Sequence, residues 1–306
     1  MPSDIDRIVS LLPSGTEILC ALGLRDRIVG VSHECDFPAD VTSLPRLTSS
    51  ILDDGLSPAE IDAAVAAAGL EQTPLYAVDG ALLESLAPDL IVTQGLCAVC
   101  AVTEDTIARS VRLATLDAHS RAPVLSLSGV NLAGIRRDIL EVGRAAGVEA
   151  EAHALLARME ADWSALPGPG AHAPTVLMLE WPDPPWSGGH WVPEQVAAAG
   201  GVDLFGTAAA SSERIQWDRV HEADPDLIIV MGCGFGLAEN LEQARRLVRD
   251  PARQSLRAVR TGRVWAADAN ALFSRPGPRV VEGAALLARI FSGLPVSKAQ
   301  AVPVTA

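Results

Sequence analysis

Four of the five cysteines in this chain come soon after short apolar segments that we expect to form strands. The cysteines are Cys35, Cys97, Cys100 and Cys233, and the apolar segments before them are residues 28–31, 90–93 and 227–231. Thiolates bind soft metal ions and act as nucleophiles. Because parallel sheets bind ligands beyond the carboxyl ends of their strands, this spacing predicts ligand or metal chemistry at that edge.

Cys97 and Cys100 form a Cys-x-x-Cys pair, which suits a zinc or iron ion or a redox dithiol. A zinc ion needs two further ligands, and the sequence holds no second pair of this kind. The candidates for the missing metal ligands are His33, Cys35 and Cys233. The alternative is that both thiols are small apolar fillers of a loop.

The loop after residues 28–31 is unusually polar because it contains His33, Glu34 and Cys35. A neutral imidazole binds cobalt, iron or zinc, so His33 is a candidate ligand to a metal centre. The alternative interpretation is a hydrogen-bonded turn closed by Phe37 and Pro38.

A second candidate histidine, His190, lies in an aromatic and glycine-rich segment that begins at Trp186. Glycines allow the backbone to approach a ligand closely, and aromatic rings beside them suit a flat, largely apolar molecule. A purely structural histidine is the alternative.

Two further loops contain candidate contacts. Residues 232–236 surround Cys233 with glycines, which favours close approach to a bulky ligand over a phosphate nest. Arg275 and Arg279 flank a Pro-Gly-Pro segment and either meet polar ligand groups or remain solvated.

The sequence contains no Gly-x-Ser-x-Gly elbow, no His-Glu-x-x-His motif and no Walker loop. We therefore expect a binding protein and not an enzyme. The alternative is a thiol-dependent enzyme with Cys97 as its nucleophile.

The segments that must position these residues alternate between strand-like and helix-like patterns, which is typical of α/β folds. The segment 87–92 resembles the segment 224–229, and each has a Pro-Asp pair before an apolar run. This repeat predicts two lobes, residues 1–130 and 167–292, each with a parallel sheet. The predicted linker between them is helical, with a break at Gly147, and residues 293–306 look like a loose tail. The linker comprises residues 131–166.

Smaller elements are also predicted. Ser14 and Glu17 have the spacing of a capping box, and a final amphipathic helix is expected over residues 278–291.

Charge and composition exclude several classes of partner. The formal net charge is −14, which argues against nucleic acid and against an anionic membrane surface. No apolar run is long enough to span a bilayer. The first residues do not have the pattern of a secretory signal, so we expect a cytoplasmic protein with reduced thiols.

Several segments resemble the substrate-binding proteins of ABC importers for cobalamin, siderophores and haem, the helical-backbone metal receptors. The segment 7–17 is similar to the first strand and helix of that family, and residues 184–189 and 273–279 are most similar to its cobalamin-binding branch. The resemblance implies the class III periplasmic-binding-protein fold: two Rossmann-like α/β lobes with parallel sheets, bridged by a long α-helix. It also implies a small-molecule ligand held in the cleft between the lobes.

In the cobalamin-binding branch, aromatic side chains contact the corrin ring, and the resemblance assigns that role to Trp186, Trp217 and Phe273. Where the first lobe of that branch has a tryptophan, this chain has Gln94, followed by Cys97 and Cys100. The family docks on its permease through one acidic residue in each lobe. At these positions the chain has Asp218 and, in the first lobe, Ala81, which has no charge.

These observations lead to one main hypothesis and two alternatives. The first is a non-enzymatic, intracellular binding protein for a corrinoid. The second is a zinc, iron or haem binding protein, and the third is a thiol-dependent, corrinoid-processing enzyme. The predicted ligand contacts are His33, Glu34, Cys35, Gln94, Cys97, Cys100, Trp186, His190, Trp217, Cys233, Phe273 and Arg275.

Overall fold

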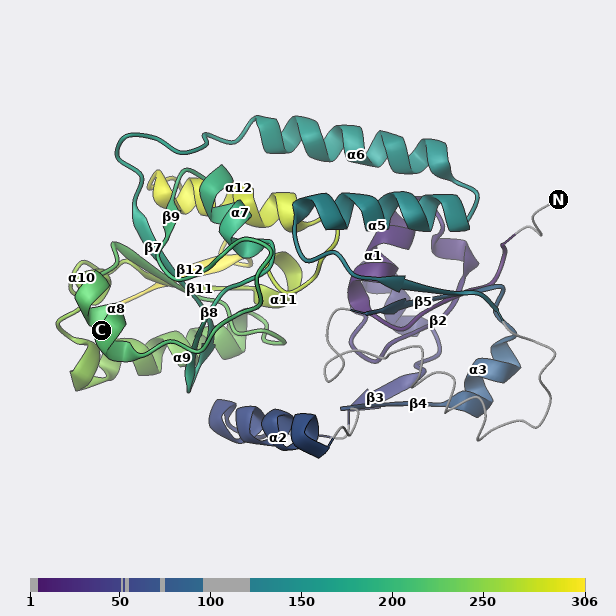
Figure 1. Ribbon diagram of the computed structural model, residues 1–306, viewed down its shortest axis with the longest axis horizontal. Helices are drawn as coiled ribbons and strands as arrows, with labels where there is room; N and C mark the ends of the chain where they lie inside the picture. Colours follow the sequence, from purple (N-terminus) through teal and green to yellow (C-terminus); the bar gives the residue numbers. More distant parts are fainter. Residues whose placement is uncertain (1–4, 51, 53–54, 72–74, 96–121, 306) are drawn as a thin grey trace. The chain divides into compact units, whose positions relative to one another are not determined.

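A computed structural model describes residues 5–50, 52, 55–71, 75–95 and 122–305 of the chain (Figure 1). These residues form two compact units. The first unit lies within residues 1–129 and 133–158, and the second contains residues 130–132 and 159–306. The boundary falls inside helix α6 (Glu149–Ser164), so the predicted long helix contributes residues to both units.

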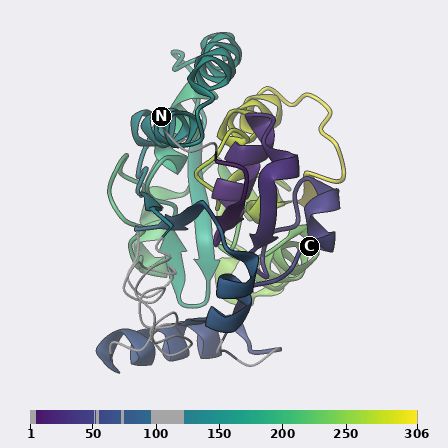
Figure 2. The ribbon, with the colours of Figure 1, turned by 90° about the vertical axis from the view of Figure 1, so that its right-hand side faces the viewer.

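The sheet of the first unit is parallel throughout and has the strand order β2–β1–β5–β6. The strands are β1 (Ile8–Ser10), β2 (Ile28–Val31), β5 (Leu90–Gln94) and β6 (Val124–Leu127). In Figure 2, β1 and β2 run side by side in purple. Nearly every residue of β1, β2 and β5 is buried, as expected for a parallel sheet that is covered on both faces.

Short helices and one antiparallel strand pair complete the first unit. They are α1 (Pro13–Ala21), β3 (Thr48–Ser50), α2 (Pro58–Glu71), β4 (Tyr76–Val78), α3 (Gly80–Leu86) and α5 (Leu132–Ala145). Gly147 separates α5 from α6, as the sequence predicts.

The predicted capping box at the start of α1 is wrong. The residue that precedes the helix is Leu12, which makes no side-chain cap, and both Ser14 and Glu17 are buried inside α1. Pro13 instead begins the helix, because its fixed φ angle and missing N–H suit the first helical position.

The predicted repeat is confirmed, and the structure gives its physical reason. In the first unit, the Asp89 carboxylate accepts a hydrogen bond from the backbone N–H of Arg7 at 3.0 Å, just before β1. In the second unit, Asp226 accepts one from the backbone N–H of Thr175 at 3.0 Å, at the start of β7. Each Pro-Asp pair therefore ties the start of its own strand to the start of the neighbouring strand.

The sheet of the second unit has the order β12–β11–β10–β7–β8, with β9 also paired to β7. Strands β7, β10 and β11 are parallel, whereas β8 and β12 run antiparallel to their neighbours. The strands are β7 (Thr175–Pro182), β8 (Pro185–Ser187), β9 (Val202–Asp203), β10 (Leu227–Val230), β11 (Val264–Ala267) and β12 (Ala301–Val304).

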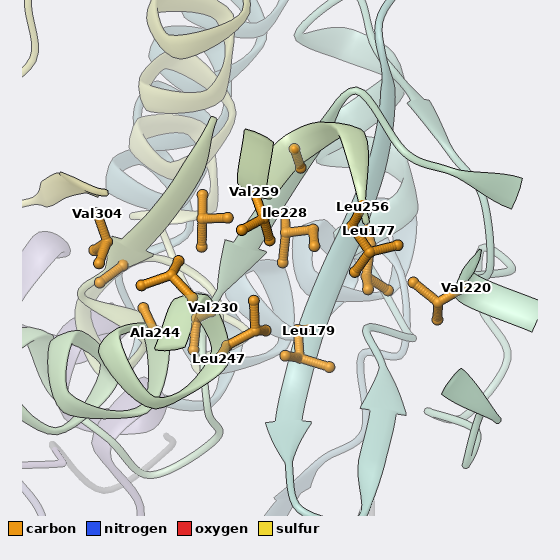
Figure 3. Close-up of a cluster of buried hydrophobic side chains, with 14 of the residues drawn as sticks. Leu177, Leu179, Val220, Ile228, Val230, Ala244, Leu247, Leu256, Val259 and Val304 are labelled. Atoms are coloured by element: carbon orange, nitrogen blue, oxygen red, sulfur yellow. The ribbon is translucent and has the colours of Figure 1, made fainter. Parts of the chain in front are cut away.

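The core of the second unit lies against one face of this sheet (Figure 3). Leu177 and Leu179 of β7 reach it together with Ile228 and Val230 of β10, because alternate residues of a strand share a face. Burying each of these side chains stabilises the unit by roughly 1.5–3 kcal/mol. The core therefore fixes the strands whose carboxyl ends carry the candidate residues.

Helices surround this sheet. They are α7 (Val192–Ala198), α8 (Trp217–Ala223), α9 (Leu237–Arg249), α10 (Arg257–Arg260), α11 (Ala269–Leu272) and α12 (Val280–Phe291). The last of them confirms the predicted final helix. Among the helices of the described residues, none combines the length and the apolar character that crossing a membrane requires.

The prediction of a loose tail is wrong. Residues 301–304 form β12, which pairs with β11, and Ala301 and Val304 are only 0% and 5% exposed. The alternation of apolar residues is short and is interrupted by Pro303, so the sequence pattern does not indicate a strand here. An edge strand tolerates proline because one side of its backbone lacks a partner.

Candidate functional site

The polar loop at the carboxyl end of β2 is joined to the strand pair β3–β4. The His33 ring nitrogen Nδ1 lies 2.6 Å from the Thr48 hydroxyl oxygen, and the His33 backbone N–H donates to the same oxygen at 3.0 Å. The Tyr76 hydroxyl donates to Glu34 at 3.3 Å, and the Tyr76 ring lies 5.5 Å from that of His33. The structure therefore brings His33 and Glu34 together with two residues that the sequence analysis missed.

Burial lowers the pKa of His33, and Arg46 acts in the same direction, while Glu34 opposes the shift. The neutral imidazole, which is the form that binds a metal, is thus favoured. Arg46 also holds the loop, because its guanidinium donates to the backbone oxygens of Ser32, His33 and Cys35 at 2.8–2.9 Å.

Cys35 does not belong to this polar surface, and its prediction as a ligand contact and metal ligand is wrong. Its side chain is 1% exposed, and its sulfur lies 3.1 Å from the Thr16 hydroxyl oxygen. The thiol therefore points into the core of the first unit, towards α1. Burial raises the pKa of the Cys20 thiol in α1 to about 11, which disfavours its thiolate form at neutral pH.

Gln94 is the last residue of β5 and is partly exposed at the carboxyl end of the strand, where the sequence analysis expects it. Cys97 and Cys100 lie outside the described residues, so their roles stay predictions. Within the part of the chain that the structure describes, no three His, Cys, Asp or Glu side chains gather in a group that would hold a metal ion. The predicted metal site also needs Cys97 and Cys100, so the roles of His33 and Cys233 in it stay predictions.

In the second unit, Glu180 lies near the carboxyl end of β7. The Ser212 hydroxyl donates to one carboxyl oxygen of Glu180 at 2.7 Å, and the Gly189 backbone N–H donates to the other at 3.3 Å. Burial raises the pKa of Glu180, and the two hydrogen bonds oppose this shift. Glu180 thus connects its strand to two loops at the same edge.

The loop that contains Trp186 and His190 packs tightly on residues 209–213. The His190 backbone N–H donates to the Ala210 backbone oxygen at 2.7 Å. A side chain on Gly189 would place its Cβ 2.4 Å from the Ser212 backbone nitrogen. This glycine therefore allows one loop to approach another, whereas the sequence analysis assigned it to approach of a ligand.

Trp186 and His190 are both partly exposed at this edge, as a ligand contact requires. The Trp186 indole nitrogen is buried and has no hydrogen-bond partner among the described residues. His190 has a backbone φ of 55°, and its ring lies 5.8 Å from that of Trp191.

The glycine-rich loop after β10 holds an exposed thiol and a pair of aromatic rings. Cys233 is exposed, as its predicted role requires. The Gly232 backbone N–H donates to the Asn240 side chain at 2.7 Å, so this amide does not serve an anion nest. The Phe235 ring lies 5.0 Å from the Trp181 ring. The sequence analysis missed both aromatic residues as ligand contacts, although Phe235 comes just after the predicted strand 227–231.

Three of the contacts predicted for this half of the chain are used in packing. Trp217 packs on the core, and the Arg253 guanidinium covers its ring at 4.1 Å. Phe273 is 2% exposed and Arg275 is 8% exposed. The predicted contact of Phe273 with a ligand is contradicted, because its side chain is buried in the structure. Arg275 is nearly as inaccessible, which contradicts its prediction as a ligand contact.

Gln195 of α7 connects the two segments that resemble the cobalamin-binding branch. Its side-chain N–H groups donate to the backbone oxygens of Leu272 at 3.0 Å and Val280 at 2.8 Å. These residues stand at the two ends of the segment 273–279, and α7 begins just after the segment 184–189. The helix α7 is therefore bonded to both ends of the segment 273–279.

Comparison with known proteins agrees with this architecture. Residues 8–271 match the family described as periplasmic binding proteins. The chain belongs to this family. Members of the periplasmic binding protein family are binding proteins, in agreement with the non-enzymatic role expected from the sequence. A search of curated proteins gives no match.

Solved structures share the periplasmic-binding-protein fold with the chain over nearly its whole length. The haem-binding protein RhuT from Roseiflexus sp. RS-1 is 24% identical, with a TM-score of 0.67 over 94% of this chain and 98% of that one. The vitamin B12 binding protein BtuF of Vibrio cholerae is 19% identical, with a TM-score of 0.60 over 94% and 97%. The haem-binding protein HutB of Vibrio cholerae is 18% identical, with a TM-score of 0.69 over 94% and 99%. Such low identities establish the fold and nothing beyond it.

Proposed function

We propose that this member of the periplasmic binding protein family binds a corrinoid, without catalysing a reaction. The observation that carries the proposal is the connection made by Gln195. Gln195 lies in α7, which follows the segment that contains Trp186, and it binds the residues on either side of the segment 273–279. The segments 184–189 and 273–279 are the ones that resemble the cobalamin-binding branch. A similar structure, BtuF, is a vitamin B12 binding protein, which supports the same ligand class.

The ligand contacts of the proposal are the partly or fully exposed residues at the carboxyl edges of the two sheets. In the first unit they are His33, Glu34 and Gln94, and in the second they are Trp186, His190 and Cys233. An imidazole or a thiolate from this set would supply an axial ligand to the cobalt of the corrinoid.

Haem is the second candidate ligand. Several similar structures are named as haem-binding proteins, among them RhuT, BhuT and HutB. A haem is also a flat conjugated ring with a central metal that accepts imidazole ligands. The same aromatic and histidine contacts therefore suit both ligands.

The two positions at which the family docks on its permease support a further part of the proposal. Ala81 is the second residue of α3 and is exposed, and a methyl group makes no ion pair with a permease. Asp218, on the exposed side of α8, is the single acidic residue at the two docking positions. We therefore propose that the protein acts without an ABC permease, in the cytoplasm.

The proposal is tested by titrating the protein with hydroxocobalamin, cobinamide and haemin, with tryptophan fluorescence and visible absorption as readouts. We expect saturable quenching by a corrinoid at micromolar concentration or below, with a shifted visible spectrum. A Trp186→Ala variant should bind about tenfold more weakly, which corresponds to about 1.4 kcal/mol. Trp163→Ala is the matched control, because Trp163 lies within the helix α6 and not in a loop that follows a strand.

Other outcomes would favour the alternatives. Binding of haemin alone would favour the haem hypothesis. Zinc or iron near one per chain, without binding of any ring, would contradict the proposal in favour of a metal-binding protein. A Cys97→Ala/Cys100→Ala variant with an unchanged affinity and spectrum would exclude those thiolates as axial ligands. Turnover of a corrinoid that stops on alkylation of Cys97 would favour the enzyme.

A further inference from the structure

We infer that Trp181 and Phe235 form a preformed aromatic platform that stacks on one face of a flat, conjugated ring ligand. The inference rests on the proposed function and adds two specificity-determining residues that the family resemblance did not assign. Trp181 lies near the end of β7, and Phe235 lies in the loop after β10. These strands are neighbours and run parallel, so both rings lie at the carboxyl edge of the second sheet.

The two rings are close enough to act as one surface. Their centroids are 5.0 Å apart, and their planes are inclined by 36°. This separation is within the range of favourable aromatic pairs. Both side chains are partly exposed, so the pair keeps accessible ring surface instead of being enclosed.

Phe235 is held in place by its backbone and by the residue beneath its ring. Its N–H donates to the Gly232 backbone oxygen at 3.0 Å, and its carbonyl accepts from Asn240 at 3.3 Å and from Asn270 at 3.2 Å. A Cβ on Gly232 would lie 2.7 Å from the Phe235 ring, so only glycine lets the ring lie against the backbone here. The ring is therefore positioned before any ligand binds.

Trp181 is held by the β-sheet. It is the cross-strand partner of Trp186, the tryptophan of the proposed contacts, in the antiparallel pair β7–β8. The backbone oxygen of the preceding residue, Glu180, accepts from the Cys233 N–H at 3.0 Å, which ties this strand end to the loop of Phe235. Trp181 and Phe235 therefore have a fixed relative position, and little order has to be gained when a ligand binds.

The pair is better suited to a ligand than to packing. Neither ring is part of the buried cluster shown in Figure 3, against which Trp217 packs. Phe273 is enclosed and Trp217 is covered by Arg253, so two of the three aromatic contacts expected from the resemblance are occupied by the protein itself. Trp181 and Phe235 offer accessible aromatic surface at the same edge as the exposed thiol of Cys233.

The experiment compares the binding of hydroxocobalamin, cobinamide, haemin and metal-free protoporphyrin IX to the wild type and to Trp181→Ala and Phe235→Ala. Visible absorption of the ring is the readout, because it does not depend on the tryptophans that are changed. Trp181→Phe and Phe235→Tyr keep an aromatic face, and Trp163→Ala is the control. Circular dichroism and thermal unfolding establish that each variant is folded.

We expect each alanine variant to bind the preferred ring about tenfold or more weakly, whereas the aromatic variants and the control stay within about threefold of the wild type. If the alanine variants do not fold, Phe235→Leu gives the test, since it keeps apolar volume but removes the aromatic face. If the wild type binds a ring and both Trp181→Ala and Phe235→Ala bind it with the same affinity, the platform is overturned and the proposed function stands. Failure of the wild type to bind any of the four rings overturns both.

Discussion

At the scale of single residues, Glu180 shows how the second unit positions the loops at the carboxyl edge of its sheet. Its carboxyl group binds the Ser212 hydroxyl and the Gly189 N–H, so one side chain connects β7 to both loops. Ionising this group inside the protein is costly, which is why burial raises its pKa. The arrangement makes the stability of the unit depend on pH.

The sign of that dependence follows from the raised pKa. The folded state holds the Glu180 proton more tightly than the unfolded state does, so the free energy of unfolding falls as the pH rises from the ordinary glutamate range through the raised pKa. We expect Glu180→Gln to remove this fall. Urea unfolding of the wild type and the variant at pH 4.5, 6 and 8 checks the prediction.

Glu213→Gln is the matched control for this measurement. Glu213 is an exposed acid next to Ser212, the residue that donates a hydrogen bond to Glu180. The control should keep the pH dependence of the wild type. A Glu180→Gln protein whose unfolding free energy varies with pH as much as that of the wild type would show that Glu180 titrates normally.

At the scale of elements, the strand β12 is the main difference between the structure and the sequence prediction, which expected a loose tail there. Val304 of this strand lies in the core cluster together with Val230 and Leu247 (Figure 3). The last residues of the chain thus complete the sheet on the side of β11. Their loss would expose both the edge of β11 and part of the core.

We expect Val304→Asp to lower the free energy of unfolding by about 3 kcal/mol, because it places a carboxylate in an apolar core and removes a buried side chain. Thr305→Asp, one residue further and exposed, should change it by less than about 0.5 kcal/mol. Chemical denaturation measures both. Equal stability of the two variants would mean that β12 does not stabilise the second unit.

The candidate contacts lie at or just beyond the carboxyl ends of strands. Residues at the carboxyl ends of β2, β5, β7 and β10 supply His33, Gln94, Trp181 and Cys233. Because the strands of each unit are parallel where these residues occur, the contacts of one unit collect at one edge of its sheet.

At the scale of the whole molecule, the charge is unevenly distributed along the chain. The net charge is −14, yet residues 244–263 contain seven arginines and one acidic residue. In α9, Arg245, Arg246 and Arg249 are exposed, whereas the apolar residues between them face the core. This basic segment is the part of the chain best suited to contact phosphate groups.

We expect no binding to duplex DNA at physiological salt, because the remaining surface is acidic and few phosphates can be neutralised at once. Any binding at low salt should come from the basic segment and should disappear in an Arg245→Glu/Arg249→Glu variant. A gel-shift titration at two salt concentrations measures this. Binding that persists at physiological salt would contradict the expectation.

The sequence by itself determined the fold class and placed the candidate residues at the ends of strands. Apolar runs that alternate with helical patterns, together with the two Pro-Asp repeats, predict two α/β units with parallel sheets, and the family comparison agrees. These signals are local, since strand and helix patterns repeat over a few residues. For the same reason His33, Gln94 and Cys233 could be placed at the ends of strands.

Only the tertiary structure decided which side chains face outward at those edges. Cys35 follows the same sequence rule as the exposed Cys233, yet it is 1% exposed. Phe273, which the resemblance assigned to the ligand, is 2% exposed. Trp181 and Phe235 lie far apart in the chain and meet because β7 and β10 are neighbours. The direction of a side chain after a strand depends on loop packing and on partners distant in sequence, such as Ser212 for Glu180 and Trp181 for Phe235. It is therefore decided only when the whole unit folds.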